Sequence, residues 1–180
     1  TIRSITIDQA LPLRRAVLWP NRPIEASMVD GDDAALHFGS FIDETLISTA
    51  SLFANESDIR LRKFATDPAF QGQGHGSAIL EHLIEYARKL GFQRFWLDAR
   101  QSAVPFYLRL KLQVDADVFL KRDEPSVRMS RHLSRTPEEP RIYLLARISP
   151  TATFNASALR STLCSQPSTP LARASAASAR

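Results

Sequence analysis

Hydrophobic and polar positions alternate with a period of two over several short runs in the first half of the chain, which is typical of half-buried β-strands. The strands predicted from these runs cover residues 2–7, 35–42, 46–53 and 59–66. The Asp43-Glu44 pair predicts a turn that joins the second and third runs into an antiparallel hairpin. A meander of three strands is therefore expected, ended by Asp67-Pro68.

Helical spacing replaces this alternation at two places. Asp8 is predicted to cap a helix that runs to Leu18, before Trp19-Pro20. In residues 77–90, apolar side chains recur every three or four positions, with charged side chains on the opposite face, which predicts an amphipathic helix. Gly91 is placed to end that helix in a left-handed conformation.

The remaining pattern predicts a strand at 92–99, a short helix at 103–110, and strands at 114–120 and 127–133. The order of elements indicates an α/β chain of the α+β type, folded as one domain over residues 1–134. Residues 135–180 are rich in Ser, Ala, Pro and Arg and are expected to be a disordered tail. Whether its apolar run, 142–148, adds an edge strand or a short helix stays open.

Charge and cysteine content narrow the function classes. The formal net charge is +4, but Lys and Arg balance Asp and Glu over residues 1–134, and the excess lies in the tail. A nucleic-acid partner is therefore not expected for the domain. The single cysteine, Cys164, forms no internal disulfide, and no apolar run approaches the length of a membrane span. We expect a cytoplasmic protein with no membrane partner.

A glycine-rich segment, Gln71-Gly72-Gln73-Gly74-His75-Gly76-Ser77, lies between a predicted strand and the amphipathic helix. Amides at a helix N-terminus carry partial positive charge, and glycines let the backbone approach an anion closely. These features indicate an anion site. A flexible turn before an ordinary helix is the alternative, because it would have the same glycine-rich sequence. The segment lacks the lysine of an NTP-binding P-loop, and its spacing is GxGxG rather than the GxGxxG of dinucleotide folds.

Two blocks of sequence carry a family resemblance. Residues 71–76 resemble the Q/R-x-x-G-x-G/A signature of the GNAT superfamily of N-acetyltransferases. Residues 98–107, Asp-Ala-Arg-Gln-Ser-Ala-Val-Pro-Phe-Tyr, resemble the downstream family segment N-A-R-x-x-A-x-x-F-Y, in the family's order and spacing. The resemblance covers residues 1–134 and implies the GNAT fold, a mixed, mostly antiparallel, splayed sheet flanked by helices.

The resemblance also implies a cofactor site. Acetyl-CoA would lie where the sheet parts, with no metal required. Backbone groups of Phe64, Ala65 and Thr66 would hold the acetyl and pantetheine portions. The pyrophosphate would be held by the loop residues Gln71, Gly72, Gln73, Gly74, His75, Gly76 and Ser77.

Tyr107 occupies the position at which many family members place the acid that protonates the departing thiolate. Simple packing of an amphipathic helix is the alternative for this side chain. For the general base, the candidates at strand ends are Glu56, Asp58 and Asp98, and a chain of waters would serve equally.

Departures from the family pattern affect two positions. Lys111-Leu112 stands where the family usually has Gly-Phe, so the lysine must adopt a strained or different turn. Asp98 stands where related sequences often carry Asn. Trp19 and Trp96 are expected in or near the core, and no catalytic pair is expected among His37, His75, His82 and His132.

The predicted activity is transfer of an acetyl group from acetyl-CoA to a primary amine on a small molecule, such as a polyamine, amino acid or amino sugar. Acetylation of protein lysines or N-termini is an alternative, as is a non-catalytic CoA-binding sensor. A homodimer is left open.

Overall fold

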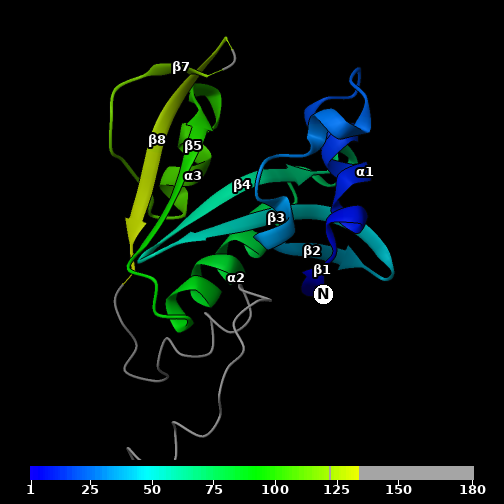
Figure 1. The fold of residues 1–180 in the computed structure, drawn as a ribbon, viewed down its shortest axis with the longest axis horizontal. Helices are drawn as coiled ribbons and strands as arrows, with labels where there is room; N and C mark the ends of the chain where they lie inside the picture. The colour runs from blue at the N-terminus through cyan, green and yellow to red at the C-terminus, as the bar shows by residue number, and fades with distance from the viewer. Residues whose placement is uncertain (122, 134–180) are drawn as a thin grey trace, which may run out of the picture. The chain divides into compact units, whose positions relative to one another are not determined.

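The computed structural model describes residues 1–121 and 123–133, and these form an eight-stranded sheet with three α-helices (Figure 1). The strands are β1 Ile2–Ile5, β2 Leu36–Ile42, β3 Thr45–Asn55, β4 Asp58–Thr66, β5 Arg94–Arg100, β6 Gln113–Val114, β7 Phe119–Lys121 and β8 Glu124–His132. The helices are α1 Ile7–Leu18, α2 His75–Lys89 and α3 Val104–Arg109. The predicted tail, with its run 142–148, lies outside the described residues.

The strand order is β1-β2-β3-β4-β5-β8-β6, with β7 paired to β8. Every described pair is antiparallel except β4 with β5, which is parallel. The predicted mixed, mostly antiparallel sheet is therefore confirmed. The predicted hairpin of β2 and β3 is confirmed as well, and Asp43 in its turn has a φ of 50°.

The parallel pair holds together over only three residue pairs, from Asp58 with Arg94 to Arg60 with Trp96. Beyond these pairs, β4 and β5 continue apart, and Figure 1 shows β1–β4 diverging from β5 and β8. A bulge at Lys63, whose φ is 56°, adds to this separation because it bends β4 after the paired segment. The splayed sheet predicted from the family resemblance is thus present.

The two faces of the sheet are covered differently. The apolar side of α2 packs on one face, in a core that includes Leu52, Ile59, Phe95 and Leu97. Ser51 lies between two core residues of β3 and so points to the opposite face, where it contacts Arg14 of α1. Since α1 packs against β2, β3 and β4, the far face of β5 and β8 has neither α1 nor α2 over it.

Several predicted boundaries are corrected by local geometry. Thr6, rather than Asp8, caps α1: its side chain accepts from the amide of Gln9, and the Gln9 side chain accepts from the Thr6 amide. Helix α2 begins at His75, two residues earlier than expected, because Gly74 takes the cap position. Its predicted end is confirmed, with Gly91 at a φ of 79°.

The strand predicted over 114–120 is wrong. The structure has β6 and β7 instead, separated by Asp115-Ala116-Asp117-Val118. The Asp115 amide donates to the Arg128 carbonyl, but its carboxylate turns away to accept from Arg94 and Ser130. The polar partners of Asp115 therefore break the strand that the alternation of apolar residues over 114–120 predicted.

Candidate active site

The glycine-rich loop joins the end of β4 to α2, and its longer side chains fold back on the chain. The side-chain amide of Gln71 donates to the Thr66 carbonyl at 2.8 Å, and that of Gln73 donates to the Ala69 carbonyl at 2.9 Å. Asp67 accepts from the Ala69 amide at 2.9 Å. These contacts hold the loop in shape without using its glycine amides.

Most backbone amides of the loop are left for a ligand. The Gln71 amide donates to the Pro68 carbonyl. The next amide along the described chain with a backbone acceptor is that of Ala78, which donates to the Gly74 carbonyl. Between them, the part of the chain that the structure describes offers no acceptor to the amides of residues 72–77. Unpaired amides at the start of a 15-residue helix are suited to bind an anion.

Glycine is required at two of these positions by backbone conformation. Gly72 has a φ of 72° and Gly74 a φ of 88°, a region in which residues with a Cβ are strained. No atom lies within 4 Å of a Cβ built on either residue. Space therefore remains beside the loop backbone for a bulky anion such as a diphosphate.

Gly76 has a different role, because it permits close packing. A Cβ at Gly76 would lie 3.1 Å from the Phe64 ring, 3.3 Å from the Thr66 hydroxyl and 3.8 Å from the Phe106 ring. The rings of Phe64 and Phe106 stack with their centroids 6.0 Å apart. The end of β4, the loop and α3 therefore meet at one place.

The end of β4 presents one free edge. On its paired edge, Ala65 and Thr66 lie in register with Thr49 and Ser48 of β3, and the Ser48 hydroxyl donates to the Ala65 carbonyl at 3.0 Å. On the other edge, β5 has already parted from β4. An extended group lying in the opening could pair with this edge as an added strand does.

Tyr107 lies on α3 in the apolar core, with 8% of its surface exposed, and its ring contacts Phe106 edge-on. The Tyr107 ring therefore packs in the core. Burial raises the pKa of the Tyr107 phenol well above its ordinary value near 10, so the group keeps its proton at any physiological pH. Lys111, just after α3, has a φ of 63°, the left-handed conformation that a glycine would adopt without strain.

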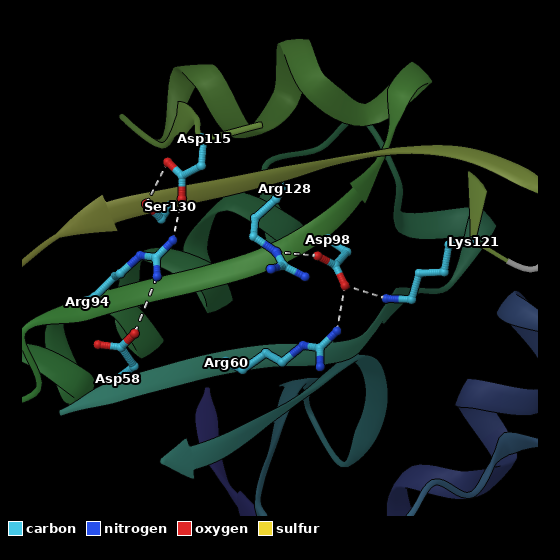
Figure 2. Close-up of polar contacts among 8 residues, drawn as sticks. All are labelled: Asp58, Arg60, Arg94, Asp98, Asp115, Lys121, Arg128 and Ser130. Carbon is cyan, nitrogen blue, oxygen red and sulfur yellow. Dashed lines mark hydrogen bonds and ion pairs between the residues drawn. The ribbon is translucent and has the colours of Figure 1, made fainter. Parts of the chain in front are cut away.

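Asp98 is poorly suited to be a base. Its carboxylate, 3% exposed, accepts from Arg60 at 2.5 Å, Lys121 at 2.7 Å and Arg128 at 3.0 Å (Figure 2). Burial raises the pKa of Asp98, but hydrogen bonds from Lys121 and Arg128, with the nearby charges, outweigh it and leave the pKa lowered. The carboxylate is therefore held ionised with both oxygens occupied.

The other two candidate bases lie at the wrong end of the sheet. Glu56 is in the turn before β4, and Asp58 begins β4 within the paired segment, where it contacts Arg94 at 3.4 Å. At about 3.3 Å per residue, Asp58 is roughly 20 Å along the strand from Phe64. Neither reaches the opening between β4 and β5.

The expectation that Trp19 and Trp96 lie in or near the core is corrected. Trp96 points away from the α2 core, and the guanidinium groups of Arg60 and Arg128 stack over its ring at 4.3 and 4.7 Å from the centroid. Trp19 is half-buried beneath the Lys63 ammonium, 3.6 Å from its ring centroid. Sequence reasoning missed this cluster of arginines, although the alternation within β4 and β8 places Arg60 and Arg128 off the core face.

The histidines lie in separate surroundings. His37 is buried beside Arg14 and Asp32, whereas His82 and His132 are exposed and His75 contacts the Phe70 ring edge-on. Among residues 1–121 and 123–133, no three metal-binding side chains gather at one place. None of the helices in these ranges is long and apolar enough to cross a membrane.

Comparisons with known proteins place this site in a family. The fold is that of acyl-CoA N-acyltransferases: a Bacillus subtilis acetyltransferase solved in complex with CoA superposes with a TM-score of 0.60 at 16% identity, over 74% of this chain and 98% of that one. The acetyltransferase (GNAT) family matches residues 7–111. The chain belongs to this family, as the resemblance predicted.

Two curated relatives agree with that assignment. The uncharacterized N-acetyltransferase YitI of Bacillus subtilis is 30% identical over 118 residues, which is 61% of this chain and 79% of YitI. The ribosomal protein bS18-alanine N-acetyltransferase of Escherichia coli K12 is 38% identical over 61 residues, 34% of this chain and 35% of that protein. The second similarity spans about a third of each chain.

Proposed function

We propose that this protein transfers the acetyl group of acetyl-CoA to a primary amine of a small molecule. The observation that carries the proposal is the row of amides at residues 72–77, which have no backbone acceptor in the described chain and follow the end of β4 that has parted from β5. A diphosphate fits such a row, because every amide there can donate to a phosphate oxygen.

The residues present fit the rest of the cofactor. Gln71, Gly72, Gln73, Gly74, His75, Gly76 and Ser77 would hold the pyrophosphate. Phe64, Ala65 and Thr66 would hold the acetyl and pantetheine portions along the free edge of β4. Acetyl-CoA would supply an activated thioester, and transfer would form an amide C–N bond while the C–S bond breaks.

Tyr107 would give its proton to the departing sulfur. Burial keeps the phenol protonated and therefore available as a donor, but the raised pKa also makes it a weaker acid than an exposed tyrosine. The attacking amine would lose its proton to water, because Asp98 is occupied by three cations. Positioning and these proton transfers suffice for a reactive thioester, and no metal is invoked.

Acetylation of a protein N-terminus is the second candidate, and the similarity to the bS18-alanine N-acetyltransferase supports it. A panel that includes free amines and an alanine-ended peptide separates the two. A sensor that binds CoA without catalysis would bind acetyl-CoA and release thiol with neither class of acceptor.

Calorimetric titration with acetyl-CoA, followed by a thiol-release assay, tests the proposal. We expect saturable binding of acetyl-CoA and much weaker binding of acetyl-pantetheine, which lacks the pyrophosphate. Equal affinity for the two ligands would contradict pyrophosphate binding by the loop. No affinity for either ligand would contradict the proposed function.

A matched pair of variants assigns any binding to the loop. Gly74→Ala and Gly91→Ala place a Cβ on left-handed residues at opposite ends of α2, with φ of 88° and 79°. Each should cost about 1–2 kcal/mol of stability. Only Gly74→Ala should weaken acetyl-CoA binding, by about tenfold or more; equal affinities would contradict the assignment.

A further inference from the structure

A group of cations gathers around a single carboxylate on the face of β5 and β8 that neither α1 nor α2 covers, and one of these cations reaches it from the neighbouring β4. Arg60 comes from β4, Asp98 from β5, Lys121 from β7 and Arg128 from β8 (Figure 2). We call these four residues the Asp98 cluster. Four strands, spread over residues 58–132, thus contribute one charged group each to a single spot.

The cluster is held in a fixed geometry. Trp96 supports both guanidinium groups, with their central carbons 4.3 and 4.7 Å from its ring centroid. The Asp98 side chain is 3% exposed and accepts a bond from each cation. The arginines are therefore pre-organised, and less entropy is lost when a ligand binds them.

The cluster carries more positive charge than its carboxylate neutralises. Three cations share one acid, and the side chains of Arg60, Lys121 and Arg128 remain 26%, 42% and 43% exposed. In addition, the Nε of Arg60 is buried and has no hydrogen-bond partner. An excess of about two charges, with spare N–H donors, is suited to an oxyanion.

The excess is local to the opening of the sheet. Towards the paired end of β4 and β5, Arg94 contacts two carboxylates, Asp58 at 3.4 Å and Asp115 at 2.5 Å, so the balance there is negative. Figure 2 shows both groups on the same side of the sheet. A ligand with charges of both signs would be oriented by this difference.

The position of the cluster connects it with the proposed reaction. Asp98 lies two residues beyond the last β4–β5 pair, so the Arg60–Asp98 contact crosses the place where the strands part. The core residues Leu97 and Ala99 on either side of Asp98 face α2. The cluster therefore lies on the far face of the opening from α2, where an acceptor can approach while the loop of α2 holds the cofactor.

We propose that the acceptor amine belongs to a molecule that also carries an oxyanion, a carboxylate or a phosphate, and that Arg60, Lys121 and Arg128 bind this oxyanion. The inference rests on the proposed function and narrows its substrate class. Polyamines are disfavoured, because their several ammonium groups would meet an excess of like charge. Amino acids and aminoalkyl phosphates fit.

Matched acceptor pairs test the charge requirement in the thiol-release assay. Alanine is compared with alaninamide, and aminoethyl phosphate with ethanolamine, with spermidine as a polycation. We expect the anionic member of at least one pair to have a kcat/KM at least tenfold above its neutral partner; the pair that shows it distinguishes carboxylate from phosphate. Preference for neutral amines or for spermidine would overturn the inference.

A variant pair assigns the effect to the cluster. Lys121→Met removes the exposed cation while Asp98 keeps both arginines, and Lys89→Met removes a cation at the far end of α2. We expect Lys121→Met to raise the KM for the anionic acceptor about tenfold, with unchanged acetyl-CoA affinity and unchanged kinetics for Lys89→Met. An unchanged KM in Lys121→Met would refute the role, whereas loss of acetyl-CoA binding in the unmodified protein would refute the proposed function instead.

Discussion

Removing the guanidinium of Arg14 should destabilise the fold severely. Arg14 is fully buried, and its Nη1 lies 3.0 and 3.1 Å from the two oxygens of Asp32, which is 4% exposed. Its Nη2 contacts the His37 ring at 3.1 Å and also donates to the Ser51 hydroxyl. In Arg14→Met the Asp32 carboxylate keeps one described donor, the Val29 amide at 2.8 Å.

The magnitude follows from burial. Breaking a buried ion pair by removing one partner costs about 3–5 kcal/mol, because the remaining charge is left without compensation. Arg3→Met is the matched control: its N–O distance to Glu44 is also 3.0 Å, but the two side chains are 53% and 88% exposed. That pair should contribute at most about 1 kcal/mol.

Urea unfolding followed by fluorescence or circular dichroism measures both variants, with the free energy of unfolding taken from the midpoint and slope. The double variant Arg14→Met, Asp32→Asn should recover part of the loss, since it removes the stranded charge. If Arg14→Met lost no more stability than Arg3→Met, the argument from burial would be refuted.

Three further outcomes are expected. Tyr107→Phe should lower kcat by about 10²–10⁴ with unchanged acetyl-CoA affinity, and Tyr86→Phe on α2 should not; equal kcat values would remove the acid role. Burial lowers the pKa of His37, so the unfolded chain binds a proton more readily and stability is lost as pH falls below about 6.5. His37→Gln should reduce that loss between pH 7.5 and 5.5, measured as the change in Tm. Lys111→Gly should raise the free energy of unfolding by about 0.5–1 kcal/mol at unchanged kcat, because it relieves the strain of a left-handed residue with a Cβ. A free energy of unfolding below that of the unmodified protein would contradict this explanation.

Local sequence determined most elements and the glycine-rich loop. The hairpin turn, the apolar face of α2 and its end at Gly91 follow from spacing within one or two turns of the chain, so they were predictable. The glycines at 72 and 74 likewise express a local backbone requirement. The start of α1 was missed although the Thr6-x-x-Gln9 spacing of a capping box is visible in the sequence. The break between β6 and β7 was missed because it depends on hydrogen bonds that Asp115 accepts from Arg94 and Ser130, which local spacing does not reveal.

Tertiary structure decided which charged side chains gather on the sheet face away from α2. Arg60, Asp98, Lys121 and Arg128 are separated by up to 68 positions, and the pairing of β5 with β4 and β8, and of β8 with β7, brings them together. Short-range patterns encode backbone conformation, whereas the local charge on a sheet face is a sum over several strands. For this reason the chain's own sequence indicates its family and its glycine-rich loop, and the sheet alone assembles the charged surface beside the opening.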